Sequence, residues 1–435
     1  MKPMNVGIIM GGFSAERHIS VESGRNIFEK LASSAFYNPI SIFLTGSLEN
    51  HQLFKLPINM LLKDSADDIH EKLMHTPYLP ERYAGSNAMQ AATAAITRKY
   101  AGVFIAQPQP ITYPELASCV DSVFIALHGR PGEDGTLQAI LEQHHIPYNG
   151  SGIESTQLTI DKFKTNQYLR AHGIQVAEQA LVLKTAWEQQ EAAIIHAVEA
   201  QFTYPLIAKP VDDGCSAAVV KIKNQAMLKA YAGATFRKEL PLPSAYAQTL
   251  DLQQQTNFPQ HERFLLEALI EQGDASHFLE ITGGLLTHLD EQGDRCYEMF
   301  EPSETVALKD ILSLEEKFLA GEGQNITPAR FHPDPVVNKA ISHDVKKELE
   351  KVARLLDIEG YARIDAFVKV YGAQHIEIWL IEVNALPGMT PATCIFHQCA
   401  MNGYTPFDFM HTIIQYGLKK KLTCQQVYKP SYEIY

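Results

Sequence analysis

Short apolar runs separated by glycine-rich and polar turns recur along the chain and predict strands alternating with helices. Residues 6–10 are apolar and end at Gly11 and Gly12, which is typical of a buried parallel strand. A helical pattern then runs to about Leu31, with Ser20, or else Ser23, as its expected N-cap. Residues 37–43 are the next apolar run. This strand–loop–helix–strand start predicts an α/β domain.

The same pattern continues through the rest of the chain. Residues 161–172 are expected to form a helix that ends at Gly173, because glycine is a common helix C-cap. In the range 282–299, Gly283-Gly284 and Gln292-Gly293 are expected to be the turns of hairpins. The other expected helices are 137–144 and 343–356, and the other expected strands are 122–127, 206–209, 218–222, 264–270, 361–370 and 377–383.

Length and composition narrow the class of protein. A chain of 435 residues is expected to fold into two or three domains. Residues 47–116 mix turn residues with apolar patches and are interpreted as an insertion with no assigned chemistry. The net charge of −13 argues against a surface that binds nucleic acid or anionic lipid. The six cysteines include no C-x-x-C pair, so neither a zinc knuckle nor a disulfide framework is indicated.

The N-terminal apolar run leads directly into a glycine turn and is interpreted as a strand, not as a signal peptide. No stretch approaches the ~20 apolar residues that span a bilayer. The sequence therefore predicts a cytoplasmic protein.

Two strands near the C-terminus carry the clearest candidate chemistry. Arg363 and Asp365 are two positions apart, as are Glu382 and Asn384, so each pair shares one face of its strand. If the strands form a hairpin, two carboxylates, an amide oxygen and a guanidinium come together. Hard oxygen ligands suit magnesium, and arginine suits a phosphate or a developing oxyanion. The residues alone leave open a surface ion-pair cluster as the alternative.

Two further elements fit a nucleotide site less specifically. Lys209 ends a strand and precedes a glycine-containing loop, an arrangement in which lysine can contact a nucleotide phosphate. The strand around Glu267 could present backbone groups to an adenine edge. Both elements are also compatible with a solvated lysine and an ordinary buried strand. No G-x-x-x-x-G-K-[ST] phosphate loop occurs in the chain.

Taken in order, these segments resemble the motifs of D-alanine–D-alanine ligases. The resemblance runs from the first strand to about residue 415, interrupted near 47–116. The N-terminal glycine motif and the His-Gly-x-x-Gly-Glu-Asp-Gly motif are specific to this family. The matching segments are residues 11–17 with Ser20, 127–136, 148–152, Asp161-Lys162, Lys209-Pro210, 316–319, 360–365 and 382–390.

The resemblance implies a three-domain ATP-grasp fold of the α/β class. An N-terminal parallel α/β domain would cover residues 1–131, and two ATP-grasp subdomains would cover 132–269 and 270–435. In the implied reaction, the carboxylate of the first D-alanine attacks the γ-phosphate of ATP and forms an acyl phosphate. The amine of the second D-alanine then displaces phosphate through a tetrahedral intermediate, and the dipeptide supplies peptidoglycan synthesis.

The resemblance also implies roles for individual residues. Asp365, Glu382 and Asn384 would hold two magnesium (or manganese) ions. Glu16 would bind the ammonium of the first substrate and His128 would lie near its carboxylate, while Arg363 and the backbone near Gly388 would stabilise the oxyanion. Lys162, Lys209 and Lys317 would bind ATP phosphates, Glu267 the adenine and Asp274 the ribose. The alternatives are that Glu16 caps the following helix, that His128 is a satisfied strand-end histidine, and that Lys162 and Lys317 are solvated.

Departures from the family pattern concern the second substrate. The loop serine and the tyrosine that usually connect to Glu16 are replaced by Cys215, with Ser216 next to it, and by Phe318. The exchange loses a phenol hydroxyl and replaces a hydroxyl donor with a weak thiol donor, unless Ser216 takes over. Phenylalanine at this position resembles ligases that accept D-lactate. Thr393, where the family often has a serine, can still donate a hydrogen bond to the second substrate's carboxylate.

The sequence thus predicts a cytoplasmic D-alanine–D-alanine ligase that uses Mg-ATP, binds small D-amino acids, and contacts neither nucleic acid nor membrane. A homodimer is implied by the family. A D-Ala–D-lactate ligase is the nearest alternative, and a catalytically inactive ATP-binding homologue is the alternative of another class.

Overall fold

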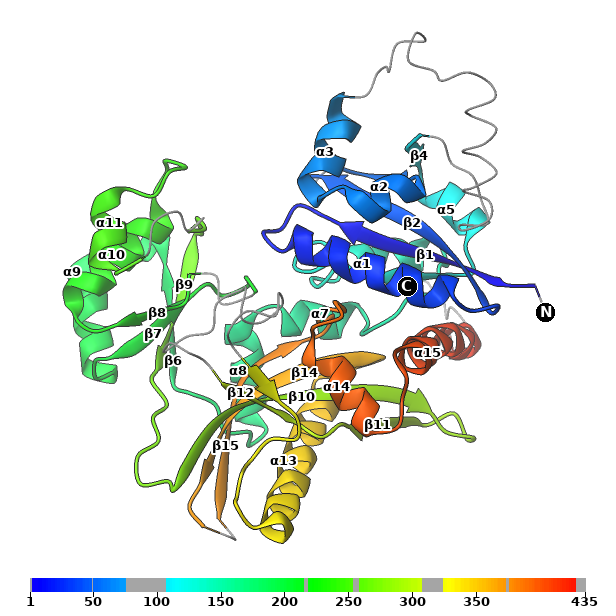
Figure 1. Cartoon of the computed structure of the whole chain (residues 1–435). Coiled ribbons are helices and arrows are strands. Elements are labelled where there is room, and N and C mark those ends of the chain that lie inside the picture. Colours follow the sequence, from blue (N-terminus) through cyan, green and yellow to red (C-terminus); the bar gives the residue numbers. More distant parts are fainter. Residues whose placement is uncertain are drawn as a thin grey trace, which may run out of the picture.

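The computed structural model describes residues 2–48, 50–75, 107–214, 218–252, 258–306, 324–372 and 375–427. Its architecture is mixed α/β, as predicted, with three separate β-sheets (Figure 1). In the described part of the chain, no helix is long and apolar enough to cross a membrane.

The N-terminal sheet has the strand order β4-β3-β2-β1-β5. Its parallel centre consists of β1 (Met4–Gly11), β2 (Tyr37–Gly46) and β5 (Ser122–Ile125), so the predicted strand–helix–strand start is confirmed. Helix α1 (Arg17–Ala32) packs on β1 and β2 and begins earlier than expected. The N-cap prediction is wrong: Ser20 lies inside α1, where its hydroxyl accepts a hydrogen bond from the Gly11 amide at 2.8 Å.

The described parts of residues 47–116 extend this sheet and cover it. Strands β3 (His51–Lys55) and β4 (Gln109–Ile111) add to it in antiparallel fashion. The accompanying helices are α2 (Ile58–Lys63), α3 (Ala66–His75) and α5 (Tyr113–Cys119).

The central sheet is a separate antiparallel layer with the order β6-β9-β7-β8. Its strands are β6 (Gln179–Leu183), β7 (Leu206–Lys209), β8 (Val220–Ile222) and β9 (Arg263–Ala268). Figure 1 shows α9 (Lys184–Gln201), α10 (Gln225–Phe236) and α11 (Ser244–Thr249) on this lobe. The connection from the N-terminal sheet contains α6 (Thr136–Gln143), α7 (Ile153–Thr159) and α8 (Lys162–Ala171).

The C-terminal sheet has the order β13-β12-β10-β14-β15, and β11 pairs with β10. It consists of β10 (His277–Leu289), β11 (Arg295–Met299), β12 (Ser303–Val306), β13 (Gln324–Ile326), β14 (Tyr361–Val370) and β15 (Ile376–Asn384). Helix α13 (Pro335–Leu355) packs against it and begins earlier than predicted, at the N-cap Asp334.

Of the two predicted hairpin turns, one is confirmed and one is wrong. The turn at Gln292-Gly293 joins β10 to β11, whereas Gly283 and Gly284 lie within β10. A Cβ at Gly283 would come 2.5 Å from Leu349 of α13, and one at Gly284 would clash with the Gln398 side chain of α14. These glycines therefore admit close packing of helices on the strand rather than a change of direction.

The last two helices, α14 (Cys394–Met401) and α15 (Pro406–Val427), connect the N-terminal and C-terminal sheets. The Tyr361 ring at the start of β14 packs between Phe124 of β5 and Phe409 of α15, with centroid distances of 6.1 and 6.0 Å. These residues belong to one hydrophobic core that extends from β1 to α15. Strand β14, which carries Arg363 and the predicted magnesium ligand Asp365, is thus anchored in the core of the N-terminal sheet.

Candidate active site

The predicted hairpin of β14 and β15 brings the four polar residues together. Arg363 lies opposite Asn384 and Asp365 lies opposite Glu382, with a β-bulge directly after Asp365. The side chains of Arg363 and Asp365 are only 13% and 9% exposed, which excludes the surface ion-pair cluster.

Asp365 is held in place from two strands. Arg363 donates two hydrogen bonds of 3.0 Å to its carboxylate, one to each oxygen, and the Thr282 hydroxyl on β10 donates a third at 2.6 Å. Burial by itself would lower the pKa of Arg363, but the surrounding groups, Asp365 first among them, together outweigh burial, and the guanidinium pKa is raised. Arg363 therefore stays charged at every physiological pH.

Lys162 links the central segment to this hairpin. Asp161 caps α8 by accepting a hydrogen bond from the Lys164 amide at 2.9 Å, which fixes Lys162 in the first turn. The Lys162 ammonium donates to the Asp213 carbonyl at 2.6 Å and lies 3.5 Å from Glu382 Oε2. Burial opposes the charge, but Glu382, Asp213 and Glu16 raise the pKa of the ammonium. The Lys162 side chain is only 12% exposed and is paired, so it is not a solvated lysine.

Two of the other predicted ATP residues, Lys209 and Glu267, lie on the central sheet. Strands β7 and β9 are adjacent, and the Lys209 ammonium lies 2.6 Å from Glu267 Oε2. Gln179 of β6 donates to the other Glu267 oxygen at 2.6 Å. Asp274 is exposed in the connection from β9 to β10 and is not brought into this group.

Glu16 stands at the N-cap position of α1 but makes no side-chain capping hydrogen bond there. A Cβ added at Gly214 would come 2.5 Å from Glu16 Oε2, so the carboxylate lies directly against the Gly214 backbone. The capping interpretation of Glu16 is thus excluded, and a residue larger than glycine at position 214 would push this carboxylate away.

His128 is enclosed by hydrogen-bond partners. Its Nδ1 lies 3.1 Å from the Leu386 carbonyl oxygen and its Nε2 lies 3.2 Å from the Ser23 hydroxyl. Since a carbonyl only accepts, Nδ1 carries the proton and donates to it, which leaves Nε2 to accept from Ser23. Burial lowers the pKa of His128, so the ring is neutral. His128 is thus a hydrogen-bonded histidine at the end of a strand, as the alternative interpretation expected. Its two hydrogen bonds connect Ser23 of α1 to Leu386, which follows β15.

Glu133 belongs to this group and was not singled out from the sequence. Its carboxylate accepts hydrogen bonds from the Gly129 amide at 2.6 Å and the Leu386 amide at 3.3 Å. Burial, with the nearby charge of Glu16, raises the pKa of Glu133 to about 8. Its position inside the His128–Gly135 motif was the signal that could have identified it.

A charged network behind Lys162 was also missed. The Asp212 carboxylate lies 2.7 Å from the Arg130 guanidinium and 3.3 Å from that of Arg263. The next carboxylate, of Asp213, pairs with His261 at 2.7 Å. These pairs tie the segment between β7 and β8 to the glycine-rich turn of the N-terminal part. They depend on contacts between distant segments, so no local pattern could have revealed them.

Gly388 and Thr393 follow β15 in buried positions. The Met389 amide, next to Gly388, donates to the Ser23 hydroxyl at 3.0 Å. Thr393 is the residue before α14, and its hydroxyl donates to the Thr390 carbonyl at 2.8 Å. The neighbouring Cys394 is buried close to Arg363 and Asp365, and burial raises the pKa of its thiol to about 11.

One pocket joins residues from the surroundings of all three sheets. It is lined by Gly129, Glu133, Thr159, Ile160, Lys162, Asp212, Asp213, Gly214, Glu382, Val383, Asn384 and Ala385. Four predicted site residues, Cys215, Ser216, Lys317 and Phe318, lie outside the described residues.

Comparison with known proteins shows to which family a chain with this site belongs. The family description "D-ala D-ala ligase N-terminus" matches residues 5–151, and "D-ala D-ala ligase C-terminus" matches residues 168–241 and 258–415. The chain belongs to the D-alanine–D-alanine ligase family. A relative named D-alanine–D-alanine ligase from Chlorobium chlorochromatii is 27% identical over 419 residues, which cover 96% of this chain and 99% of the relative.

Solved structures of D-alanine–D-alanine ligases share the fold of this ligase-family chain. The enzyme from Coxiella burnetii superimposes with a TM-score of 0.65 at 18% identity, covering 98% of this chain and 97% of that one. The enzyme from Bacillus anthracis, solved in complex with ATP, gives a TM-score of 0.57 at 19% identity, with 97% and 99% coverage. The predicted ATP-grasp fold of this ligase is thereby confirmed.

The residues of this ligase fit a magnesium site. In the described part of the chain, no group of three His, Cys, Asp or Glu side chains is arranged as a metal site, so a purely carboxylate or imidazole site is not present there. Asp365, Glu382 and Asn384 instead offer two carboxylates and an amide oxygen from adjacent strands, which is the hard oxygen chemistry that magnesium takes together with phosphate oxygens and water.

Proposed function

We propose that this protein is an ATP-dependent ligase that joins two D-alanines through an acyl phosphate. The observation that carries the proposal is the position of Lys162. Its ammonium interacts with the Asp213 carbonyl, the Glu382 carboxylate and the charge of Glu16, so one cation connects the N-terminal, central and C-terminal parts. A ligase needs this convergence, because it must hold an amino acid against the γ-phosphate of ATP.

In this proposal, Lys162, Lys209 and Lys317 bind the phosphates, and Glu267 and Asp274 hold the adenosine. Asp365, Glu382 and Asn384 would hold two magnesium ions (or manganese), which would neutralise charge on the transferred phosphate. Lys209 and Glu267 are already paired. A phosphate that enters would therefore compete with Glu267 for the Lys209 ammonium.

Glu16 would bind the ammonium of the first D-alanine, whose carboxylate attacks the γ-phosphate and releases ADP. His128 would lie on the carboxylate side and fix the Leu386–Met389 backbone through its two ring nitrogens. The amine of the second D-alanine then attacks the acyl carbon, loses a proton, and displaces phosphate. Arg363, permanently charged, and the amide near Gly388 would stabilise the tetrahedral oxyanion. Thr393 would contact the carboxylate of the second substrate.

The acceptor is tested by competition. The enzyme is incubated with ATP, D-alanine and D-lactate from pH 6 to pH 9, and the products are identified by mass spectrometry. We expect the D-Ala–D-Ala dipeptide at every pH. Depsipeptide as the main product at the acidic end would instead assign the enzyme to D-lactate, with Cys215, Ser216 and Phe318 as the residues to exchange first.

Further parts of the proposal concern the cell. The enzyme would act in the cytoplasm, where ATP is available, as a homodimer without nucleic-acid partners, and its dipeptide would enter peptidoglycan synthesis and so maintain cell shape. The chain would divide into three domains at residues 1–131, 132–269 and 270–435.

A further inference from the structure

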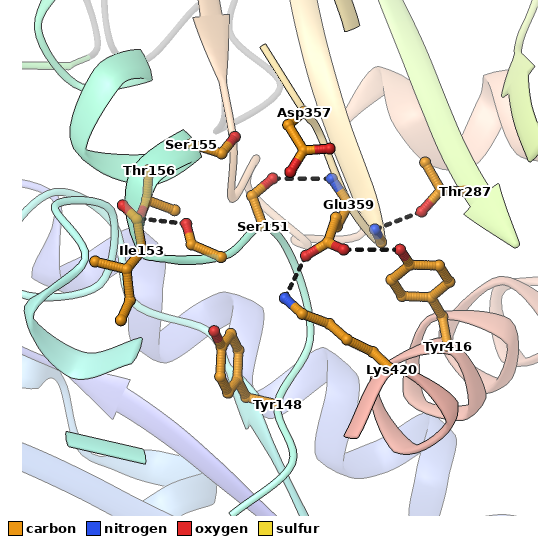
Figure 2. Close-up of polar contacts among 12 residues, drawn as sticks. Tyr148, Ser151, Ile153, Ser155, Thr156, Thr287, Asp357, Glu359, Tyr416 and Lys420 are labelled. Atoms are coloured by element: carbon orange, nitrogen blue, oxygen red, sulfur yellow. Dashed lines mark hydrogen bonds and ion pairs between the residues drawn. The ribbon is translucent and has the colours of Figure 1, made fainter. Parts of the chain in front are cut away.

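The short segment between α13 and β14 is hydrogen-bonded to the first turn of α7 and to the loop before it (Figure 2). The Ser155 hydroxyl donates to the Leu356 carbonyl at 2.7 Å, and the Glu359 amide donates to the Ser151 hydroxyl at 3.0 Å. These four residues are all buried. The chain therefore enters β14 along a fixed path.

Gly360 completes this attachment on the opposite side. Its amide donates to the Thr287 hydroxyl at 2.5 Å, and its carbonyl accepts from the Thr287 amide at 2.7 Å. Its φ of 72° is left-handed, and a Cβ there would come 2.8 Å from the Gly150 amide nitrogen. Only glycine meets both conditions, so the backbone at residue 360 is set by β10 and by the loop at Gly150 together.

The Glu359 carboxylate binds side chains from two further elements. Tyr416 of α15 donates to its Oε1 at 3.0 Å, and the Arg295 guanidinium of β11 lies 2.6 Å from the same oxygen. Lys420 of α15 pairs with Oε2 and lies over the Tyr148 ring at 5.1 Å (Figure 2). The Glu359 side chain is 8% exposed, so these charges interact largely out of water.

A pocket of about 490 Å³ lies beside this cluster and is lined by Arg295, Arg354 and Lys420 among others. Its cations are already paired with carboxylates of the chain. Arg295 is shared between Glu359 and Asp357, Lys420 pairs with Glu359, and Arg354 pairs with Glu350. The cluster is therefore directed inward, at the entry to β14, and not at a ligand.

This entry sets the register of the catalytic hairpin. Tyr361 pairs with Leu286 directly after Gly360, and Arg363 and Asp365 follow on the same strand. A displacement at Glu359 would pass into the pairing of Asp365 with Glu382. We propose that Glu359 is a positioning residue for the ligase reaction, acting through β14 on Arg363 and Asp365. The inference rests on the proposed function.

The test compares two buried, ion-paired carboxylates. Glu359→Gln keeps the shape of the side chain and removes its charge. The matched control is Asp64→Asn, because the Asp64 side chain is also 8% exposed and pairs with a lysine, Lys72, far from β14. For wild type and both variants, kcat, KM for ATP, the half-saturating magnesium concentration and the melting temperature are measured.

We expect Glu359→Gln to lower kcat about 10- to 100-fold and to raise the half-saturating magnesium concentration, since small displacements of catalytic groups have effects of this size. Asp64→Asn is expected to lower the melting temperature comparably and to leave kcat within about twofold of wild type. If both variants lose stability and kcat in parallel, or if Glu359→Gln keeps wild-type kcat, the positioning role is overturned.

Two further variants keep the test decisive if Glu359→Gln folds poorly. Tyr416→Phe removes one hydrogen bond to Glu359. It is expected to lower kcat, as Glu359→Gln does, without a change in KM for ATP. Glu359→Gln combined with Lys420→Met removes the orphaned ammonium and is expected to recover stability but not kcat; recovery of both would overturn the proposal. Wild-type protein that releases no phosphate with D-alanine would reject the proposed function instead.

Discussion

At the scale of single residues, the candidate active site depends on a few poorly solvated charges that compensate one another. Lys162 lies between the Asp213 carbonyl and the Glu382 carboxylate, and Arg363 donates one hydrogen bond to each carboxylate oxygen of Asp365. Removing one partner from such a pair leaves an uncompensated charge in a poorly solvated site. Effects on chemistry must therefore be separated from effects on folding.

Glu382→Gln separates them at the metal site. The amide keeps the size of the side chain but loses the charge that magnesium and Lys162 share, so phosphate release is expected to fall at least about 100-fold. The melting temperature should change little, because the amide oxygen of the new side chain can still accept a hydrogen bond from Lys162, whose ammonium also keeps the Asp213 carbonyl as a partner. Glu377→Gln, on the same strand β15 but away from the pocket, is the control. Wild-type turnover of Glu382→Gln would contradict the metal assignment.

Glu133 predicts a pH dependence of stability. Its pKa in the folded protein is raised from 4.5 to about 8, so the folded chain keeps a proton that the unfolded chain has lost. The free energy of unfolding of the wild type therefore falls as the pH rises between these values, by up to about 1.4 kcal/mol per pH unit. In urea titrations, the free energy of unfolding of Glu133→Gln should lack this fall with pH, so the variant should become more stable relative to the wild type as the pH approaches 8. Parallel curves for the two proteins would show that Glu133 is ionised in the fold.

At the scale of elements, the site is built where a strand, a helix start and a glycine turn meet. Strand β14 supplies Arg363 and Asp365, the first turn of α8 supplies Lys162, and the end of β1 leads to Glu16. Each element is fixed by local features, such as the Asp161 cap of α8 and the left-handed Gly360 before β14.

Gly360→Ala tests the entry of β14. The new methyl group would meet the Gly150 amide at 2.8 Å, and the left-handed backbone would be strained, so a loss of stability of about 1–3 kcal/mol or more is expected. The control is Gly273→Ala, which is also left-handed but has no atom within 4 Å of the added Cβ. If urea unfolding gave the same loss of stability for both variants, the close contact with Gly150 would not contribute to it.

Local patterns predicted most strands and the pairing of β14 with β15, because period-two alternation and turn residues are encoded locally. They failed where tertiary packing decides. Gly283 and Gly284 resembled a turn but lie within β10, since α13 and Gln398 need the space. Ser20 resembled an N-cap but lies inside α1, where its hydroxyl accepts a hydrogen bond from the Gly11 amide. The Asp212 network could not be predicted, because its partners Arg130 and Arg263 come from distant segments.

At the scale of the whole molecule, ligand binding should be coupled to stability. The pocket is made of segments from the N-terminal, central and C-terminal parts, so a bound nucleotide would hold them together. Figure 1 shows the central sheet as a lobe of its own beside the other two. Its ties to the N-terminal part include the Arg130–Asp212 pair.

Removal of the metal provides the corresponding prediction. ADP with magnesium is expected to raise the melting temperature, since a ligand at 100 times its Kd stabilises by about 2.7 kcal/mol. Adding EDTA should remove most of this shift, because the carboxylates of Asp365 and Glu382 then face the phosphates without a cation between them. Thermal scans with ADP, with and without magnesium, measure the effect. Equal shifts would contradict a magnesium site at the hairpin.

The most direct test of the central claim is phosphate release from ATP with and without D-alanine, with the amino-acid product identified in the same samples. We expect phosphate release that depends on D-alanine and on magnesium, with one D-Ala–D-Ala formed for each phosphate. Phosphate release that D-alanine does not stimulate, or nucleotide binding with no release at all, would contradict a ligase and indicate an inactive ATP-binding protein.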